Sequence, residues 1–263
     1  MQVFVSNVGI AGPGLNGWAD ARPVLAGEIA YQAAPTSRAT PDILCAAERR
    51  RSSQSARLAI LAAEDALCAG GLKGEEIATI FASSDGDGAI TQEICESLAG
   101  LARDVSPTSF HNSVYNAPAG YWSIATHSRL ASTSICAYDV SFAAGLLEAA
   151  TYAVVEREAV MLVASDLPFP APLHAIRPVA DSFAAAILIS PSPAPGSFVR
   201  CEVSLQPRSS STAFPEGLPE RLRSNPAARS LPLLAVFAKR MIATVRIEYS
   251  DNHDVVVSCE PRG

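Results

Sequence analysis

The sequence is poor in charged residues, and positive charge is the scarcer sign. Charged residues make up 17% of the 263 residues, with 20 Lys and Arg against 26 Asp and Glu, for a formal net charge of −6. Only two of the basic residues, Lys73 and Lys239, are lysines. A general nucleic-acid binder needs a cationic face that displaces counterions, so this composition argues against one. Because 49% of the residues are hydrophobic, the composition also predicts a buried core rather than a disordered chain.

Long apolar runs, a leader peptide and closely spaced cysteines are also missing. The most apolar stretches are residues 182–190, which are too few, and residues 231–245, which Lys239 and Arg240 interrupt. A membrane span needs about 20 apolar residues, so neither stretch predicts one. The first six residues have no basic region and are typical of a strand rather than of a signal peptide. The six cysteines contain no CxxC pair, which predicts reduced, buried thiols in a cytoplasmic protein.

Apolar segments of strand length alternate with helical segments over most of the chain. The predicted strands are residues 3–9, 77–83, 132–137, 159–164 and 183–189, and the predicted helices are residues 52–69, 88–98 and 141–157. Residues 107–126 are also predicted to be helical. Continuous apolar strands separated by helices predict a parallel sheet covered on both faces. Residues 207–230 are predicted to form a long loop, and residues 243–249 and 254–259 a final hairpin.

Five segments, in order, resemble those of a β-ketoacyl synthase. They are residues 49–67 as the first long helix, 81–88 as the glycine-rich turn, 110–122 as the dimer-interface helix, 134–139 as the strand that delivers the nucleophile, and 181–188 as a later buried strand. The resemblance covers roughly residues 1–205. It implies an α/β fold, a thiolase-like layered α/β sandwich with a complete N-terminal half and an abbreviated C-terminal half. The whole chain, residues 1–263, is then a single domain whose residues 206–263 are shortened and diverged.

The resemblance also shows where the sequence departs from a catalytic ketosynthase. In Ser134-Ile135-Cys136-Ala137-Tyr138-Asp139, the position that matches the nucleophilic cysteine is Asp139. The family's HGTGT segment, a lysine and a second histidine have no counterpart here. The only histidines after Asp139 are His174 and His253, and neither lies in an HGT sequence. We therefore expect no catalytic residue in this chain.

Several residues that could take part in catalysis or metal binding also fit a purely structural role. A carboxylate accepts an acyl group poorly, so Asp139 or Ser141 is predicted to cap the following helix. Cys136 as a substitute nucleophile is the weaker alternative, because it would lie on a buried strand. The four histidines have no metal-ligand spacing, and Asp85 and Asp87 fit a tight turn better than a calcium loop, so no metal is expected.

Two groups of residues are predicted to act at surfaces that the resemblance implies. Residues expected near the end of an acyl tunnel, where they would set chain length, are Thr91, Ile94, Thr108, Ser109 and Phe110. Residues expected at the dimer interface are His111, Asn112, Val114, Tyr115, Asn116, Tyr121 and Trp122. The segment Arg49-Arg50-Arg51 is either a solvated helix entrance or a docking patch for an acidic acyl carrier protein.

These features lead to two predicted functions. The first is a non-catalytic subunit similar to a chain-length factor, in a shortened form resembling that of aryl polyene biosynthesis. It would form a heterodimer or heterotetramer with an active ketosynthase and shape the tunnel in which chains grow on acyl carrier protein, with no cofactor. The alternative is a free-standing, diverged acyltransferase, hydrolase or malonyl decarboxylase of the same fold. A homodimeric acyl-binding module is a third, weaker prediction.

Overall fold

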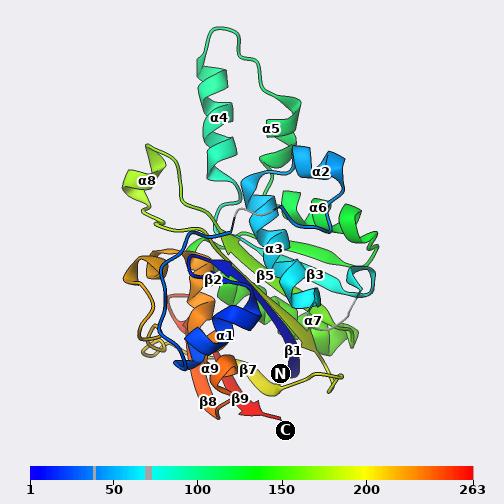
Figure 1. The fold of residues 1–263 in the computed structure, drawn as a ribbon, viewed down its shortest axis with the longest axis vertical. Coiled ribbons are helices and arrows are strands. Elements are labelled where there is room, and N and C mark those ends of the chain that lie inside the picture. Colours follow the sequence, from blue (N-terminus) through cyan, green and yellow to red (C-terminus); the bar gives the residue numbers. More distant parts are fainter. Residues whose placement is uncertain (38–39, 69–72, 263) are drawn as a thin grey trace.

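The computed structural model describes residues 1–37, 40–68 and 73–262, and a single mixed sheet runs through this part of the chain (Figure 1). The order of the strands is β4-β3-β5-β6-β1-β7-β9-β8, with β2 paired to β1. The strands are β1 (Gln2–Gly12), β2 (Leu15–Asn16), β3 (Ala78–Ala82), β4 (Ser132–Ile135), β5 (Val160–Asp166), β6 (Phe183–Ser190), β7 (Val199–Pro207), β8 (Ala243–Glu248) and β9 (His253–Pro261).

The helices lie on both faces of this sheet. They are α1 (Trp18–Ala26), α2 (Ala46–Arg51), α3 (Gln54–Cys68), α4 (Gly88–Ala99), α5 (Pro107–Asn112), α6 (Ala117–Thr126), α7 (Ser141–Glu156), α8 (Leu173–Ile176) and α9 (Leu231–Lys239), with short 3-10 helices η1 (Gly74–Glu76), η2 (Tyr138–Val140), η3 (Glu220–Ser224) and η4 (Pro226–Ser230). The predicted end of the helix at residues 52–69, at residue 69, lies outside the described residues.

Only part of the sheet is parallel, which corrects the prediction of a parallel sheet. Strand β3 pairs in parallel with β4 and β5, whereas β5–β6, β6–β1, β1–β7, β7–β9 and β8–β9 are antiparallel. The connection from β5 to β6 contains only the short helix α8 and no helix that crosses the sheet, so β6 runs back beside β5. Strands β5 and β6 are buried along their whole length, which explains their continuous apolar pattern.

Two apolar clusters hold the layers together. Helices α3 and α6 pack on one face of the sheet, against Phe81, Met161 and Val163. Helix α7 packs on the other face, against Ile80 and Leu162, and α9 belongs to the same cluster, beside α1 and β8. At Gly145 in α7, a Cβ would come within 2.7 Å of Leu162 and 3.0 Å of Ala82, so α7 needs a glycine there to approach the sheet. The layered sandwich expected from the sequence is therefore confirmed.

The C-terminal segment continues the same sheet. The predicted hairpin is present as β8 and β9, and the predicted loop at residues 207–230 contains η3 and η4. The sequence patterns did not predict α1, β7 and α9. Within the described residues, no helix is both long enough and apolar enough to cross a membrane.

The prediction of buried cysteines is correct for only two of the six. Cys201 and Cys259 are opposite each other on β7 and β9, buried and reduced, with their Sγ atoms 3.8 Å apart. The other four, Cys45, Cys68, Cys95 and Cys136, are exposed. They lie at helix ends, on the surface of α4 and after the edge strand β4, where packing covers little of each residue.

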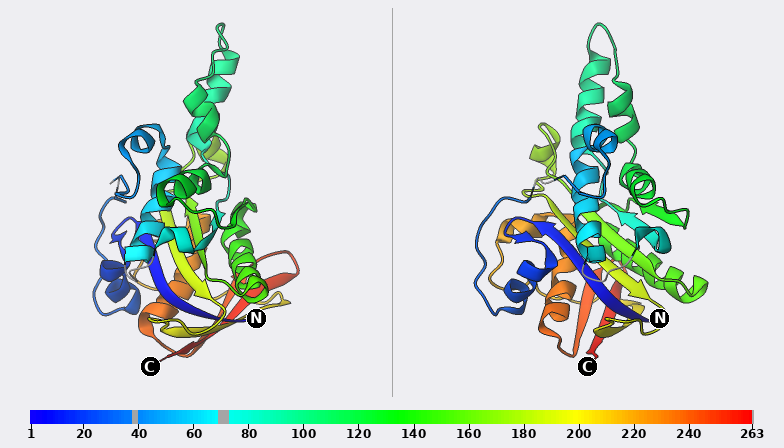
Figure 2. Two further views of the ribbon diagram at one scale, coloured as in Figure 1. Left: turned by 90° about the vertical axis from the view of Figure 1, so that its right-hand side faces the viewer. Right: turned by 45° about the vertical axis from the view of Figure 1, so that its right-hand side comes forward.

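The helices α4 and α5 project from the body as an arm, which we define as residues 88–112. Figure 1 shows the arm at the top of the molecule, and both views in Figure 2 show it standing clear of the sheet. Residues 107–126, predicted as one helical stretch, form two helices separated at residues 113–116. Asp87 caps the arm's first helix by accepting a hydrogen bond from the Ile90 N–H, at 3.1 Å.

Candidate functional site

The C-terminal ends of β3, β4 and β5 meet at one edge of the sheet, where the arm begins. Because the three strands are parallel, the turns that follow them gather the side chains of Ser83, Ser84, Asp139 and Asp166 at this edge. This edge contains the position at which the sequence predicts the family's nucleophile.

Asp139 is held in ion pairs in the short helix η2, between β4 and α7. Its Oδ1 lies 2.5 Å from Arg177 Nη2, and its Oδ2 lies 3.7 Å from Arg229 Nη2. Arg177 is well buried, with 16% of its side chain exposed, whereas 42% of the Asp139 side chain is exposed. The carboxylate is therefore engaged by two guanidinium groups rather than free to attack a substrate.

The predicted helix cap at Asp139 or Ser141 is not found, which corrects that interpretation. Val140 precedes α7, and no side chain caps the first turn of the helix. The Ser141 hydroxyl instead accepts a hydrogen bond from Ala137 N–H at 2.9 Å. It can donate to the carbonyl oxygen of Tyr138, at 2.7 Å, or of Ser83, at 3.0 Å. Ser141 therefore ties the turn to the end of β3.

Tyr138 gives this turn an unusual backbone conformation. Its φ is 53°, in the left-handed region that residues other than glycine seldom adopt. The guanidinium carbon of Arg177 lies 3.7 Å from the centre of the Tyr138 ring, so the same cation contacts both the ring and the Asp139 carboxylate. Arg177 thus contacts two successive residues of the turn and stabilises its shape.

Cys136 lies just after β4. As a whole residue it is exposed, and it is not buried in the strand as predicted. Its thiol donates a hydrogen bond to the Ser84 carbonyl oxygen at 3.3 Å. Partial burial of the sulfur raises the pKa of the Cys136 thiol, and the negative charge of the Asp85 carboxylate raises it further. A raised pKa leaves little thiolate at neutral pH, so the sulfur is a poor nucleophile.

Asp166 and Arg177 lie at this edge, and the sequence patterns singled out neither of them. Asp166 is the more deeply placed of the two, being fully buried. It is the last residue of β5, and its Oδ1 accepts hydrogen bonds from Ser84 N–H at 2.7 Å and from the Ser83 hydroxyl at 3.2 Å. Complete burial raises the pKa of this carboxyl to about 6. The only signal in the sequence was a single acidic residue directly after an apolar run.

The structure places all five predicted tunnel residues on the arm. Thr91, Thr108 and Phe110 are exposed, and Ile94 is partly buried. Ser109 is buried instead, and its hydroxyl donates to Glu93 Oε1 at 2.7 Å, so it joins α5 to α4. These side chains therefore share one projecting element, but Ser109 faces the inside of the arm.

The predicted interface residues divide into an exposed and a buried group. His111, Val114, Tyr115 and Asn116 are exposed. Asn112, Tyr121 and Trp122 are buried within this chain. Asn112 donates to the carbonyl oxygens of Arg51 and Thr108, both at 2.9 Å, and Trp122 packs against Phe81. The buried group supports the surface from below.

The sequence matches a known protein family over most of its length. The model of the family described as "Beta-ketoacyl synthase, N-terminal domain" matches residues 24–246. The chain belongs to the β-ketoacyl synthase family. No curated protein matches the sequence.

Solved structures of similar fold include members of ketosynthase assemblies. One is a chain from the complex of the ketosynthase ApeO with its chain length factor ApeC from Xenorhabdus doucetiae, with a TM-score of 0.73 and 22% identity over 98% of this chain and 99% of that chain. A second is from the ishigamide ketosynthase/chain length factor, with a TM-score of 0.75 and 12% identity over 100% of each chain. A third is from the type II polyketide assembly AntDE:AntF, with a TM-score of 0.73 and 12% identity over 98% of this chain and 99% of that chain.

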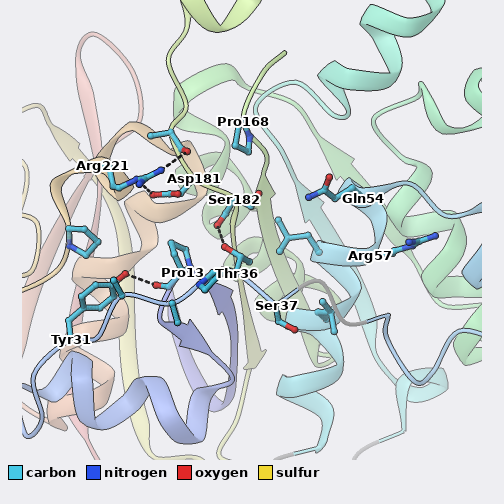
Figure 3. Close-up of a pocket in the computed structure, with 17 residues that line it drawn as sticks. Pro13, Tyr31, Thr36, Ser37, Gln54, Arg57, Pro168, Asp181, Ser182 and Arg221 are labelled. Atoms are coloured by element: carbon cyan, nitrogen blue, oxygen red, sulfur yellow. Dashed lines mark hydrogen bonds and ion pairs between the residues drawn. The ribbon is translucent and has the colours of Figure 1, made fainter. Parts of the chain in front are cut away.

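A separate cavity lies away from the C-terminal ends of β3, β4 and β5. It has a volume of about 690 Å³ and lies between α3, the segment of residues 31–37 and η3 (Figure 3). Arg221 forms an ion pair with Asp181 at one end, and Tyr31 donates to the Pro13 carbonyl oxygen at 3.1 Å. No histidine or cysteine is among the described residues that line it, and none of the predicted site residues does so. Its size suits a small molecule, but its lining offers no nucleophile beside a base.

Proposed function

We propose that this chain is a non-catalytic subunit that pairs with an active ketosynthase and, in the manner of a chain-length factor, shapes its acyl tunnel. The observation that carries the proposal is the pairing of Asp139 with Arg177 at the position of the family's nucleophile. Attack by a carboxylate on a thioester would give an anhydride, and the ion pair further lowers the reactivity of this one. The function of the chain then depends on the proteins that it binds.

The alternative, a free-standing acyltransferase, hydrolase or decarboxylase, has less support. Cys136 donates its hydrogen bond to a backbone carbonyl, and burial raises the pKa of its thiol. Among the described residues, neither Cys136 nor Asp139 shares a hydrogen bond or ion pair with a histidine. An activated nucleophile needs such a base within hydrogen-bonding distance.

An exposed apolar surface supports a subunit role. Phe110 is 68% exposed and Leu101 is fully exposed, and both lie on the arm. Further large apolar side chains are exposed on the arm, around α6 and before β4: Leu98, Val114, Tyr115, Ile124 and Leu130. A surface of this kind, on an element that projects from the body, is typical of a protein–protein interface rather than of a monomer.

The edge strand β4 supports the same conclusion. On its inner side, the Ala131 and Ile135 carbonyl oxygens accept hydrogen bonds from Thr79 N–H and Ser83 N–H, both at 3.0 Å. Because backbone groups alternate along a strand, those of Ser132 and Ser134 point away from β3 toward the open edge. An open edge of this kind can bind a strand of another subunit.

A carrier protein is the second partner that we propose. The Arg49-Arg50-Arg51 segment ends α2, and all three residues are exposed, in a chain whose net charge is −6. Arg49 is partly committed to this chain, since it donates to the carbonyl oxygens of Leu44 and Asp42. The exposed guanidinium groups of Arg50 and Arg51 would complement an acidic partner such as an acyl carrier protein.

Co-expression with an intact ketosynthase encoded near the same gene tests the proposal. We expect the two chains to co-elute in size-exclusion chromatography and to elongate malonyl units on carrier protein only as a pair. In a control complex, the ketosynthase's nucleophilic cysteine is replaced by alanine, and all condensation should stop. Turnover by the present chain alone, or by that control complex, would overturn the non-catalytic role, and separate elution would overturn the pairing.

A further inference from the structure

Two buried cysteines face each other on neighbouring strands, at the end of the molecule away from the arm (Figure 1). Cys201 on β7 and Cys259 on β9 are direct partners in the antiparallel register, and their Sγ atoms are 3.8 Å apart. Both are buried in one apolar cluster, and neither residue is more than 2% exposed. The other buried positions of the two strands in this cluster are valines: Val199, Val203, Val255 and Val257. The two cysteines thus interrupt a run of valines at one pair of facing positions.

The hydrogen bonds between β7 and β9 show that this pair of positions suits a disulfide. The Arg262 N–H donates to the Phe198 carbonyl oxygen, and the Arg208 N–H donates to the Asn252 carbonyl oxygen, both at 2.9 Å. These bonded pairs flank an unbroken register, so hydrogen-bonded pairs occur at the even-numbered positions of β7 and the two cysteines form a non-hydrogen-bonded pair. The Cα atoms of such a pair are about 4.5 Å apart, within the range of about 4.4–6.8 Å that a disulfide spans. A bond between the sulfur atoms therefore needs no rearrangement of the strands.

We propose that Cys201 and Cys259 form a reversible disulfide by exchange with a small-molecule disulfide, oxidised glutathione. One cysteine thiolate attacks a sulfur of the glutathione disulfide and releases one glutathione, which leaves a mixed disulfide on the protein. The second cysteine then attacks the protein sulfur of the mixed disulfide and releases the second glutathione. The two protein thiols lose two protons and two electrons, and one glutathione disulfide becomes two molecules of glutathione.

This exchange requires the ends of the strands to open. The hydrogen bond with Cys259, followed by burial, raises the pKa of the Cys201 thiol, so the closed pair contains little thiolate. Cys201 is the third residue of β7, and Cys259 is the third residue from the end of β9. Strand ends open more readily than the middle of a sheet. Opening at this end of β9 therefore exposes both sulfur atoms while the rest of the sheet stays folded.

A bond at this position would restrain most of the C-terminal segment. The two cysteines are 58 residues apart, and the loop between them contains η3, η4, α9 and β8. Arg229, which pairs with Asp139, lies in this loop. A disulfide that closes so long a loop restricts the unfolded chain, so the oxidised protein is the more stable form. The edge strand β4 lies at the other end of the strand order from β7, β9 and β8, so the bond leaves the proposed subunit interface unchanged.

The test equilibrates the full chain with mixtures of reduced and oxidised glutathione, both without urea and in urea below the unfolding midpoint, where strand ends open more often. Remaining thiols are then blocked with N-ethylmaleimide, and mass spectrometry of the digested chain identifies the linked cysteines. Melting temperatures are measured for the oxidised and the reduced chain. The matched controls are Cys201→Val and Cys259→Val, because valine already fills the neighbouring buried positions of both strands.

We expect a peptide linked through Cys201 and Cys259, formed about tenfold faster in urea than without it. The oxidised wild type should melt about 5–10 °C above the reduced wild type, and dithiothreitol should reverse the change. In either valine variant, oxidation should leave the melting temperature within about 1 °C of the reduced value. The exposed cysteines should take up glutathione instead of linking to one another: Cys45, Cys68, Cys95 and Cys136.

Absence of the linked peptide in urea would overturn the inference. An oxidised wild type that melts at or below the temperature of the reduced wild type would also overturn it, because the bond would then strain the fold. Neither result bears on the proposed function, which is tested by pairing with a ketosynthase.

Discussion

Asp139 Oδ1 and Arg177 Nη2 are 2.5 Å apart, across a connection of 38 residues. Arg229 approaches the other oxygen of Asp139 and also pairs with Glu248 at 3.3 Å, and Glu248 pairs with Arg208 at 2.7 Å. Charges of alternating sign thus connect the turn after β4 with the C-terminal segment. Asp139, which stands where the sequence predicts the family's nucleophile, therefore links two distant parts of the chain.

Asp139→Ala should lower stability without affecting condensation by the complex. Loss of the carboxylate leaves Arg177 largely buried without its ion pair, and we expect the free energy of unfolding to fall by about 1 kcal/mol, since the aspartate is half-exposed. Fluorescence-detected unfolding reports this change, because Trp122 is fully buried. In a double-mutant cycle, Arg177→Met should add little to Asp139→Ala. A thousandfold loss of rate in an assembled complex would show that Asp139 takes part in the chemistry.

Asp139→Cys should not create a ketosynthase. The new thiol would sit beside Arg177, which favours a thiolate, but among the described residues no histidine bonds to this turn to complete the chemistry. We expect neither condensation nor transfer from acyl carrier protein by the purified variant alone, measured by mass spectrometry of the carrier-bound products. Condensation by this variant without a partner would show that the C-terminal segment supplies catalytic groups.

Asp166→Asn should change how stability depends on pH. Burial raises the pKa of this carboxyl to about 6 in the folded chain, above its value of about 3.9 in an unfolded one. Between these values the folded state binds the extra proton, so this group's contribution to stability is greatest at low pH and is lost as pH rises through 6. The wild type should therefore gain about 1 kcal/mol relative to Asp166→Asn between pH 7 and pH 5. Parallel pH profiles of unfolding for the two chains would contradict the burial effect.

Without a partner, the chain should self-associate at micromolar concentration through the arm. Leu101→Ser and Phe110→Ser together should reduce this association and also weaken pairing with a ketosynthase, while leaving the unfolding free energy nearly unchanged, because both side chains are exposed. Sedimentation velocity measures the association. Leu205→Ser is the control, since this exposed leucine lies on β7, in the C-terminal part of the sheet. A monodisperse wild-type monomer would argue against an interface on the arm.

Sequence patterns predicted a helix or strand correctly where the residues of that segment alone form a clear pattern. Helices α3 and α7 and strands β5 and β6 were predicted, since each is a long apolar stretch bounded by turn residues. The direction of β6 could not be read, because a strand buried on both faces has the same pattern in either direction. Helix α1 was missed because Pro23 lies inside it. Strand β7 was missed although its apolar and polar residues alternate as in a half-buried strand, because the other predicted strands of the sheet are continuous apolar runs.

The candidate site was likewise predictable only where a local motif marks a residue. The place of Asp139 followed from a local motif, whereas its partner Arg177 lies on a distant connection with no motif of its own. The burial of Trp122, which the sequence predicts at an interface, likewise depends on how α6 packs against β3, which no local pattern specifies.

Thr91→Phe and Thr108→Phe should shorten the product of the complex by whole two-carbon units. Both threonines are exposed on the arm, so a larger side chain does not disturb the fold of this chain.

Ser109→Phe is a poorer probe, because Ser109 is buried against α4 and bonded to Glu93, and a phenyl group there would separate α5 from α4. If the arm borders the end of the partner's tunnel, overpacking costs about 1–3 kcal/mol. That cost corresponds to a roughly tenfold to hundredfold shift from extension to release. A conjugated chain is stiff and cannot fold back from an obstruction, so the shift should be sharp. Mass spectrometry of carrier-bound intermediates measures the length, with Glu96→Phe on another face of α4 as the control. An unchanged length distribution in both threonine variants, with pairing intact, would leave the arm a purely structural role.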